Sequence, residues 1–300
     1  MEKPFTIRGV IPPLLTPFTD HGAQVDEGAL RAEVRWLLDR GVHGLMTCGT
    51  TGEGVLLSPA ERMRVLEVVL DAAGHRVPII AHVGTAATGE TVELARHARA
   101  SGADAISVVT PYYFHLSDSA LIAHYCRVAE AVPDVALFLY NIPQNTGNDL
   151  SRAVVEAIVA RCPNVVGIKD SSGRLSRIKE FVQVREGTFQ VVCGSDRLLL
   201  RALQAGACAS VSGDANVFPE VVTGLFEAYW RGDLEGARRQ QELLDAIRSL
   251  LSGGDSLALM KRGQQLRGLR GGAVRPPLLE PSEEVVAQLE RNLRTLRLLA

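Results

Sequence analysis

Residues 101–109 read Ser-Gly-Ala-Asp-Ala-Ile-Ser-Val-Val, so that a glycine just past a helical stretch is followed directly by an apolar run. The same transition occurs at 41–48 and again at 205–211, which read Ala-Gly-Ala-Cys-Ala-Ser-Val. Glycine often ends a helix because it adopts the left-handed backbone conformation without strain, and a short apolar run bounded by turn residues is typical of a buried strand. The repetition predicts one helix-to-strand unit that is used several times along the chain.

Strand candidates follow one another at intervals of roughly 30 residues, the length of a βαβ unit. The eight candidates are centred near Val10, Leu45, Ile79, Ile106, Leu137, Val165, Val191 and Ala209. Nearly continuous apolar strands are buried on both faces, as in parallel sheets. Eight such strands that alternate with helices predict an α/β protein with a closed (β/α)8 barrel, a TIM barrel, in preference to an open doubly wound sheet.

The strand pattern stops near Arg231, and this suggests how the chain is organised. Residues 1–231 are predicted to form the barrel, which is the catalytic domain. Residues 232–300 keep a helical spacing of apolar side chains and contain a final helix from Ser282. We interpret them as a C-terminal helical extension and not as a second catalytic domain.

Composition and charge exclude several classes of protein. Of the 300 residues 46% are hydrophobic, and 32 Lys and Arg stand against 34 Asp and Glu, a formal net charge of −2. Such an apolar chain is not disordered, and dispersed basic residues at near-neutral charge give no footprint for nucleic acid or an anionic membrane. We therefore expect a small-molecule partner, with no nucleic acid and no membrane.

Cysteines and histidines offer no sign of a metal site. The five cysteines are far apart and form no Cys-x-x-Cys pair, and the seven histidines show no His-Glu-x-x-His spacing. The N-terminus lacks the unbroken apolar segment of a signal peptide, and no apolar run approaches the ~18 residues of a membrane span. We expect a soluble, unprocessed, cytoplasmic protein without a metal.

Lys169 ends the sixth predicted strand, and the catalytic groups of such a barrel lie at the C-terminal ends of the strands or in the loops that follow. Because side chains alternate along a strand, we expect Val165, Gly167 and Lys169 to share one face. A lysine at the apolar mouth of a barrel loses solvation, which favours the neutral amine that attacks a carbonyl to form a Schiff base. The alternative is a lysine that extends to solvent or pairs with the carboxylate next to it in the chain.

Tyr140 lies near the end of the fifth predicted strand, one strand away from Lys169. A phenol both donates and accepts a proton, which the formation and dehydration of a carbinolamine require. Tyr140 is therefore a candidate acid/base residue for the same cavity. The alternative is a packed tyrosine whose hydroxyl has one hydrogen-bond partner.

A glycine-rich turn at 48–54, Cys-Gly-Thr-Thr-Gly-Glu-Gly, follows the second predicted strand. A helix is expected next, because Ser58 suits the N-cap, Pro59 the first helical position and Glu61 the capping box. The turn then lies at the barrel mouth, where its N–H groups and hydroxyls would hold a carboxylate and Thr50 would relay protons. The turn matches neither the dinucleotide pattern nor the phosphate loop, and the alternative is an ordinary tight βα turn.

Four short motifs occur together in the chain. They are Gly-Thr-Thr-Gly-Glu at 49–53, Val-Thr-Pro-Tyr-Tyr at 109–113, Tyr-Asn-Ile-Pro at 140–143 and Gly-Ile-Lys-Asp at 167–170. In this order and spacing they resemble the dihydrodipicolinate synthase / N-acetylneuraminate lyase family, and the likeness extends over nearly the whole chain. The resemblance implies an enzyme without a cofactor that binds pyruvate, or a 2-oxo acid that releases it, as a Schiff base. It also implies a homotetramer or homodimer.

The resemblance assigns catalytic roles to the matching residues. Lys169 matches the Schiff-base lysine, and Tyr140 matches the acid/base tyrosine. Thr50 matches the residue of the turn that relays protons, and Thr51 with Gly49 matches the part that holds the pyruvate carboxylate.

Further positions match the family less directly. Tyr113 matches the tyrosine that reaches into a neighbouring subunit's site in the synthases, and Gly194 and Val211 match positions that line the pocket through their backbones. Asn145 stands where the lysine-pathway synthases carry an arginine that grips a substrate carboxylate. Asp214 has no counterpart and would either meet a polyhydroxylated substrate or cap the following helix.

The missing arginine favours the aldolase branch of the family, because an amide cannot copy the bidentate grip of a guanidinium on a carboxylate. The alternative is another arginine that reaches in from a loop. We expect a Schiff-base lyase that cleaves a 2-oxo acid, of the 4-hydroxy-2-oxoglutarate or 2-keto-3-deoxy sugar-acid type, to pyruvate and an aldehyde. The alternative reaction is the condensation of pyruvate with aspartate semialdehyde by a dihydrodipicolinate synthase. Outside the enzymes, a ligand-binding relative without turnover is a further alternative.

Overall fold

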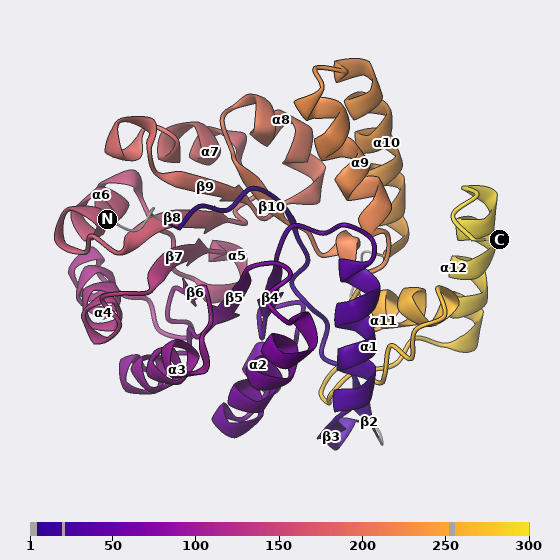
Figure 1. Ribbon diagram of the computed structural model, residues 1–300, viewed down its shortest axis with the longest axis horizontal. Coiled ribbons are helices and arrows are strands. Elements are labelled where there is room, and N and C mark those ends of the chain that lie inside the picture. The colour runs from indigo at the N-terminus through magenta and orange to yellow at the C-terminus, as the bar shows by residue number, and fades with distance from the viewer. Residues whose placement is uncertain (1–4, 20–21, 252–255, 300) are drawn as a thin grey trace.

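The computed structural model describes residues 5–19, 22–251 and 256–299. Its main sheet contains eight parallel strands in the order β1-β10-β9-β8-β7-β6-β5-β4, wrapped into a nearly closed barrel with helices outside it (Figure 1). The strands are β1 Gly9–Ile11, β4 Leu45–Thr47, β5 Ile79–His82, β6 Ala105–Val109, β7 Ala136–Asn141, β8 Val165–Asp170, β9 Gln190–Cys193 and β10 Ala209–Val211. All eight predicted strands are present, and the predicted TIM barrel is confirmed.

The segment after β1 closes the last seam of the barrel. The amide of Met46 in β4 donates to the carbonyl of Pro12 at 3.0 Å, and the amide of Leu14 donates to the carbonyl of Met46 at 2.8 Å. Since a proline offers no N–H of its own, this seam uses the carbonyl of Pro12. Just beyond it, β2 Phe18–Thr19 and β3 Gln24–Val25 form a separate antiparallel pair.

Helices follow most of the strands and cover the outside of the barrel (Figure 1). They are α1 Glu27–Leu38, α2 Pro59–Ala73, α3 Thr88–Ser101, α4 Asp118–Ala131, α6 Arg152–Arg161, α7 Leu175–Phe181, α8 Leu199–Gln204 and α9 Pro219–Trp230, with the short α5 Pro143–Thr146 after β7. The predicted start of α2 is confirmed, because Ser58 and Glu61 form the reciprocal capping box and Pro59 is the first helical residue.

The register of β7 and β8 sets the position of the lysine. Tyr140 pairs with Lys169, and a register shift opposite Leu137 and Phe138 interrupts the regular pairing. The expected alternation is therefore wrong at the start of β8, because Val165 packs in the outer core between barrel and helices. Gly167 does face inward, since a Cβ there would lie 2.5 Å from the ring of Phe138, and Lys169 shares that face.

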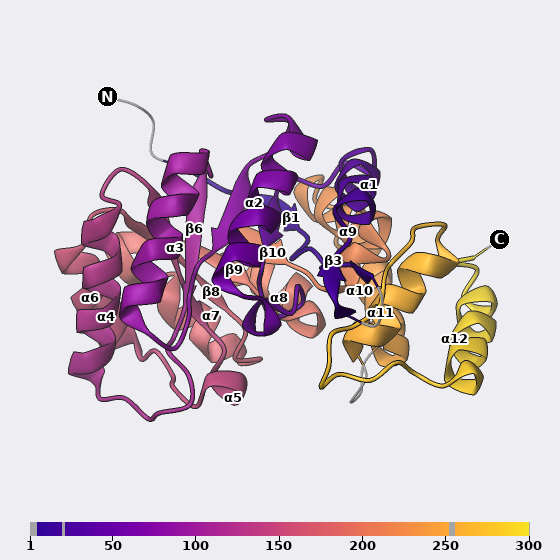
Figure 2. The same ribbon diagram turned by 90° about the horizontal axis from the view of Figure 1, so that it is seen from below.

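Three further helices follow the barrel, namely α10 Leu234–Leu251, α11 Ser256–Leu266 and α12 Glu283–Thr295. They lie together at one end of the molecule, beside α1 and α9 (Figure 2). The division of the chain into a barrel of residues 1–231 and an extension of 232–300 stays a prediction. No helix of the described residues is long and apolar enough to cross a membrane.

Candidate active site

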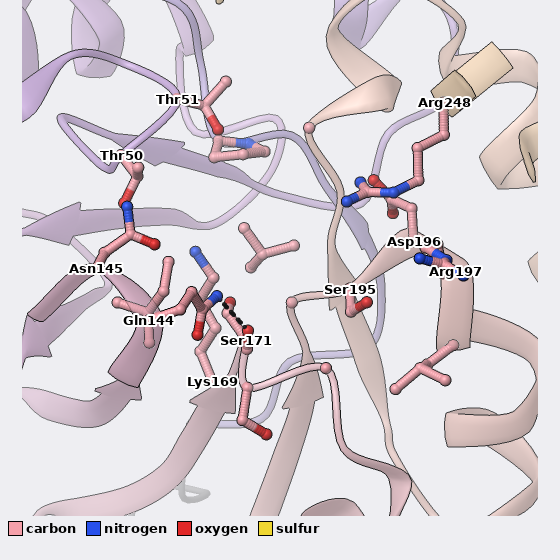
Figure 3. Close-up of a pocket in the computed structure, with 18 of the residues that line it drawn as sticks. Thr50, Thr51, Gln144, Asn145, Lys169, Ser171, Ser195, Asp196, Arg197 and Arg248 are labelled. Atoms are coloured by element: carbon pink, nitrogen blue, oxygen red, sulfur yellow. Dashed lines mark hydrogen bonds between the residues drawn. The ribbon is translucent and has the colours of Figure 1, made fainter. Parts of the chain in front are cut away.

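A cavity of about 810 Å³ opens at the C-terminal ends of the barrel strands (Figure 3). Seven of the ten residues that the sequence singled out for binding or chemistry line it: Thr50, Thr51, Tyr140, Asn145, Lys169, Gly194 and Val211. Sites of this size are typical of small-molecule ligands. The cavity also lies at the end of a TIM barrel where catalytic groups are found.

Lys169 points into this cavity from the end of β8, and its side chain is only 6% exposed. Its Nζ lies 3.8 Å from the centre of the Tyr140 ring. The adjacent Asp170 does not pair with it, because its carboxylate accepts bonds from Asn141 Nδ2 at 2.9 Å and Ser172 Oγ at 2.7 Å. Among the described residues no carboxylate lies within ion-pair distance of the Lys169 amine.

Tyr140 is buried, and its hydroxyl lies 3.1 Å from Thr50 Oγ1. The two oxygens are joined by one hydrogen bond in which either can donate. Thr50 itself lies in the exposed rim of the cavity, so this pair connects the space around Lys169 with solvent. Such a pair of hydroxyls can pass a proton in either direction.

His82, for which the sequence indicated no role, stands edge-on to the Tyr140 ring with 5.7 Å between ring centres. Arg62 holds it in place, because Nη2 of Arg62 lies 2.8 Å from the His82 carbonyl and 3.2 Å from His82 Nδ1. Burial, together with the charges of Arg62 and Lys169, holds the pKa of His82 well below its usual range. His82 is therefore a neutral imidazole that supports the buried face of Tyr140.

The glycine-rich turn has a strained backbone. Cys48 and Glu53 adopt left-handed conformations, with φ of 53° and 54°. The amide of Gly54 donates to the carbonyl of Gly49 at 3.0 Å, and a Cβ on Gly54 would lie 1.9 Å from the carbonyl oxygen of Cys48. Gly49 closes the turn in this way and does not itself line the cavity.

Glu53 fixes the turn from behind. Its Oε1 lies 2.6 Å from Nζ of Lys261 in α11, and both side chains are excluded from solvent. The same ammonium donates to the carbonyls of Thr16 and Ala273, each at 2.6 Å, while Glu53 Oε2 accepts the amide of Arg275 at 2.8 Å. A residue of the C-terminal helices thus determines where Thr50 and Thr51 stand.

A second wall of the cavity contains Gly194 together with residues that no sequence motif indicated. Gln144 donates to the carbonyl of Ser171 at 2.8 Å (Figure 3), and a Cβ on Gly194 would lie 2.0 Å from Ser171 Oγ. The lack of a side chain at Gly194 therefore keeps this part of the cavity open. Beyond it stand Asp196 and three arginines, which spacing alone could not connect to the lysine.

Asp214 does not reach the cavity. It is fully buried, and its amide donates to Asp196 Oδ2 at 3.4 Å. Burial and the neighbouring Asp196 raise the pKa of Asp214 well above its usual range, and burial also raises the pKa of Asp196. Neither role expected for Asp214 is therefore seen, because it does not line the cavity and the following helix α9 starts after Phe218 without a side-chain cap.

Tyr113 also lies outside the cavity. It is 87% exposed, has a φ of 83°, and stacks edge-on against Phe114 with 5.1 Å between ring centres. Within one chain it does not meet Lys169 or Tyr140. Among the described residues, no three His, Cys, Asp or Glu side chains lie together as metal ligands would.

Comparison with known proteins gives the same family throughout. The model of the dihydrodipicolinate synthetase family matches residues 6–296. A DapA-like lyase of Halobacterium salinarum, itself uncharacterised, is 41% identical over 297 residues, which are 99% of this chain and 96% of the relative. The 4-hydroxy-tetrahydrodipicolinate synthase of Methanopyrus kandleri is 39% identical, with 98% of each chain covered.

Solved structures agree with these relatives. The crystal structure of YagE, a prophage protein of Escherichia coli K12 in complex with pyruvate, superposes with a TM-score of 0.92 at 32% identity, covering 97% of this chain and 99% of the other. A dihydrodipicolinate synthase from Aquifex aeolicus gives 0.91 at 33% identity, with 97% and 98% covered. The barrel, the cavity and this likeness over almost its whole length establish that the chain belongs to the dihydrodipicolinate synthetase family and is an enzyme of the class I aldolase and lyase type found there.

Proposed function

We propose that this enzyme reversibly cleaves a 2-oxo acid, of the 4-hydroxy-2-oxoglutarate or 2-keto-3-deoxy sugar-acid type, to pyruvate and an aldehyde. One observation carries the proposal. The amine of Lys169 is buried at the barrel mouth beside Tyr140, without a carboxylate partner among the described residues. Such an amine is available to attack a carbonyl, and the Tyr140–Thr50 hydroxyl pair stands next to it.

The chemistry follows from these groups. Nζ of Lys169 attacks the 2-oxo carbon, and Tyr140 supplies the proton with which the carbinolamine loses water to give an iminium. The phenolate that Tyr140 has become then takes the proton of the C4 hydroxyl, and the C3–C4 bond breaks. Its electron pair moves into the iminium, which becomes an enamine, and the aldehyde leaves. Protonation of the enamine at C3 and hydrolysis of the resulting imine release pyruvate and restore the amine.

The turn at 48–54 would hold the carboxylate of the 2-oxo acid. Thr51 lines the cavity, and its hydroxyl and backbone N–H are donors of the kind that would fix the reacting carbon beside the lysine. The reaction needs no metal and no further cofactor, because the iminium itself withdraws the electrons.

The second candidate is the condensation of pyruvate with aspartate semialdehyde. The identity of 39% to a protein named 4-hydroxy-tetrahydrodipicolinate synthase favours it. Against it stands Asn145, which lines the cavity as a neutral amide where the resemblance implies an arginine that grips the semialdehyde's carboxylate.

We also propose that the enzyme acts in the cytoplasm as a homotetramer or homodimer. Tyr113 and Phe114 form an exposed aromatic pair, 87% and 71% exposed. Large apolar side chains that stand together in solvent often mark a contact surface. In the assembly proposed here, Tyr113 contacts the site of a second copy.

The test of the Schiff base is treatment of the protein with pyruvate and borohydride, which reduces an imine to a stable secondary amine. Peptide mass spectrometry is expected to find the pyruvoyl adduct on Lys169 and no adduct in Lys169→Ala. Lys179→Ala, which removes an exposed lysine of α7, is the matched control and should be labelled like the parent. An unlabelled, folded parent protein would refute the proposal.

The two reactions are separated by an assay with both kinds of aldehyde. We expect retro-aldol release of pyruvate from 4-hydroxy-2-oxoglutarate or from 2-keto-3-deoxygluconate to exceed turnover of pyruvate with aspartate semialdehyde. The opposite order would make the enzyme a synthase.

A further inference from the structure

Three arginines line the side of the cavity that lies across from the glycine-rich turn. Arg197 belongs to the 3-10 helix η4 Asp196–Leu198, Arg201 to α8 and Arg248 to α10. Arg197 and Arg248 stand opposite Thr50 and Asn145 (Figure 3). Two distant parts of the chain thus bring guanidinium groups to one wall.

None of these three arginines forms an ion pair or a side-chain hydrogen bond with another described residue, but the charge of Arg248 opposes the rise that burial causes in the pKa of Asp196 and Asp214. Other arginines of the molecule behave differently. Arg177 pairs with Asp149 at 2.7 Å, and Arg275 pairs with Glu61 at the same distance. Guanidinium groups in a cavity without a carboxylate partner keep their full capacity to bind an anion.

The charge of the wall is positive. Asp196 is the one acidic residue among the described residues that line the cavity, against the cations Lys169, Arg197, Arg201 and Arg248. Asp196 is buried and adjoins the buried Asp214, and two such carboxyls cannot both be ionised at low cost. Asp245, one turn before Arg248 on α10, is exposed and accepts a bond from Gln241 at 3.0 Å.

The cavity is larger than pyruvate requires. Even with a water's share of about 30 Å³ for each atom, the six heavy atoms of pyruvate fill on the order of 180 Å³. The cavity measures about 810 Å³. The remaining space extends from Lys169 toward the arginine wall, where the aldehyde half of a longer substrate would lie.

We propose that Arg197, Arg201 and Arg248 form an anion subsite that binds a carboxylate or phosphate at the end of the substrate remote from its 2-oxo group. The inference rests on the proposed function and names the substrate class, a 2-oxo acid with a second anionic group. A guanidinium meets either anion with two parallel N–H donors. These arginines would supply a cation from the wall near α10, in place of the arginine that is missing at position 145 on the opposite side.

Two matched pairs of substrates test the subsite. In the first pair, 4-hydroxy-2-oxoglutarate carries a carboxylate where 4-hydroxy-2-oxopentanoate carries a methyl group. In the second pair, 2-keto-3-deoxygluconate differs from its 6-phosphate only by the phosphate. We expect kcat/KM for pyruvate release to be roughly 10- to 100-fold higher for the anionic member of at least one pair, the size expected for a charged hydrogen bond. The pair that responds identifies the anion.

Substitution of the arginines tests whether they cause the preference for the anionic substrate. Arg248→Gln and the double variant Arg197→Gln/Arg201→Gln are expected to remove most of this preference, mainly through KM of the anionic member, and to leave the neutral member nearly unchanged. Arg248→Lys should keep part of it, because the charge stays but the bidentate geometry is lost. Arg238→Gln is the control, since Arg238 is exposed on the same helix and does not line the cavity.

The kinetic results are interpreted together with the borohydride trapping of pyruvate on Lys169. If pyruvate labels Lys169 but both neutral members are turned over as well as their anionic partners, the anion subsite is refuted and the proposed function stands. The same holds if the arginine variants keep the preference of the parent. If pyruvate labels nothing, the proposed function itself fails.

Discussion

Tyr140 shows how much of the site depends on one atom. Its ring is held by His82 and lies beside Lys169, while its hydroxyl has Thr50 as partner. Tyr140→Phe keeps the ring and removes only the proton donor. We expect kcat to fall by about 10²- to 10⁴-fold, the usual contribution of a general acid or base, with little change in the melting temperature. Steady-state kinetics and circular dichroism measure both, and an unchanged kcat would exclude Tyr140 as the proton carrier.

Glu33 is a buried carboxyl that makes stability depend on pH. Burial, the first cause, raises its pKa to about 7, against smaller opposing effects of bonds with Gln264 and Leu15 and of the charge of Lys261. Since the unfolded chain ionises near the ordinary value of 4.5, the folded protein binds the extra proton between these values, and stability falls as pH rises from 4.5 through 7.

The matching experiment is Glu33→Gln. At about 1.4 kcal/mol for each pKa unit, the pH-dependent loss is on the order of 3 kcal/mol. We expect the parent protein to lose unfolding free energy between pH 5 and 8 more steeply than the variant does in denaturant titrations. Parallel pH profiles for the two proteins would contradict this assignment.

The residues on one side of the cavity could be predicted from the sequence, and those on the other side could not. Lys169, Tyr140 and Thr50 could be singled out because each carries a reactive group at the end of a predicted strand or in the turn after it, and their roles stay predictions. His82 ends a strand too, but nothing in its neighbours indicates that Arg62 would hold it against Tyr140. Arg248 could not be found, because only the packing of α10 beside η4 brings it to the cavity.

The glycine-rich turn is the element on which substrate binding depends. Gly54→Ala would place a Cβ 1.9 Å from the carbonyl oxygen of Cys48, so the turn must open. We expect a loss of about 1–3 kcal/mol, as for other overpacked sites, and a lower kcat/KM because Thr50 and Thr51 move. Chemical denaturation and kinetics report the two effects.

Gly89 provides the control for this substitution. It lies in the first turn of α3, is exposed, and a Cβ there would have no atom within 4 Å. Gly89→Ala is expected to stabilise the protein by up to about 1 kcal/mol through helix propensity, with kinetics unchanged. Equal effects at Gly54 and Gly89 would mean that the turn adapts freely.

Among the elements, position was easier to predict than orientation. All eight strands lie where apolar runs and glycines predicted them. The side-chain directions along β8 were predicted correctly only from Gly167 onward. The register shift against β7 places Val165 in the outer core between barrel and helices. Such a shift depends on the neighbouring strand, which the sequence of β8 does not contain.

On the scale of the whole molecule, the ion pair of Glu53 and Lys261 joins the catalytic turn to the C-terminal helices. Lys261→Met would leave the Glu53 carboxylate buried without its cation, and breaking such a pair costs about 3–5 kcal/mol. The double variant Glu53→Gln/Lys261→Met should recover much of the loss, since no uncompensated charge remains. The unfolding free energies of the parent, of Glu53→Gln, of Lys261→Met and of the double variant form a double-mutant cycle.

A surface pair on α6 serves as the reference for this cycle. Arg152 and Glu156 are 45% and 47% exposed and lie 2.8 Å apart. Removing either is expected to cost no more than about 0.5 kcal/mol. If Lys261→Met lost no more unfolding free energy than a variant without Arg152, water would have to reach the Glu53 carboxylate.

The same ion pair also sets the order in which the enzyme is completed during its synthesis. Chains emerge from the ribosome N-terminus first, at about 5–20 residues each second, so the turn and all eight strands are made before α11. Until Lys261 emerges, Glu53 has no cation to bind, and the backbone that carries Thr50 and Thr51 is not yet fixed. The strands of the barrel are therefore complete before the contact that fixes the catalytic turn can form.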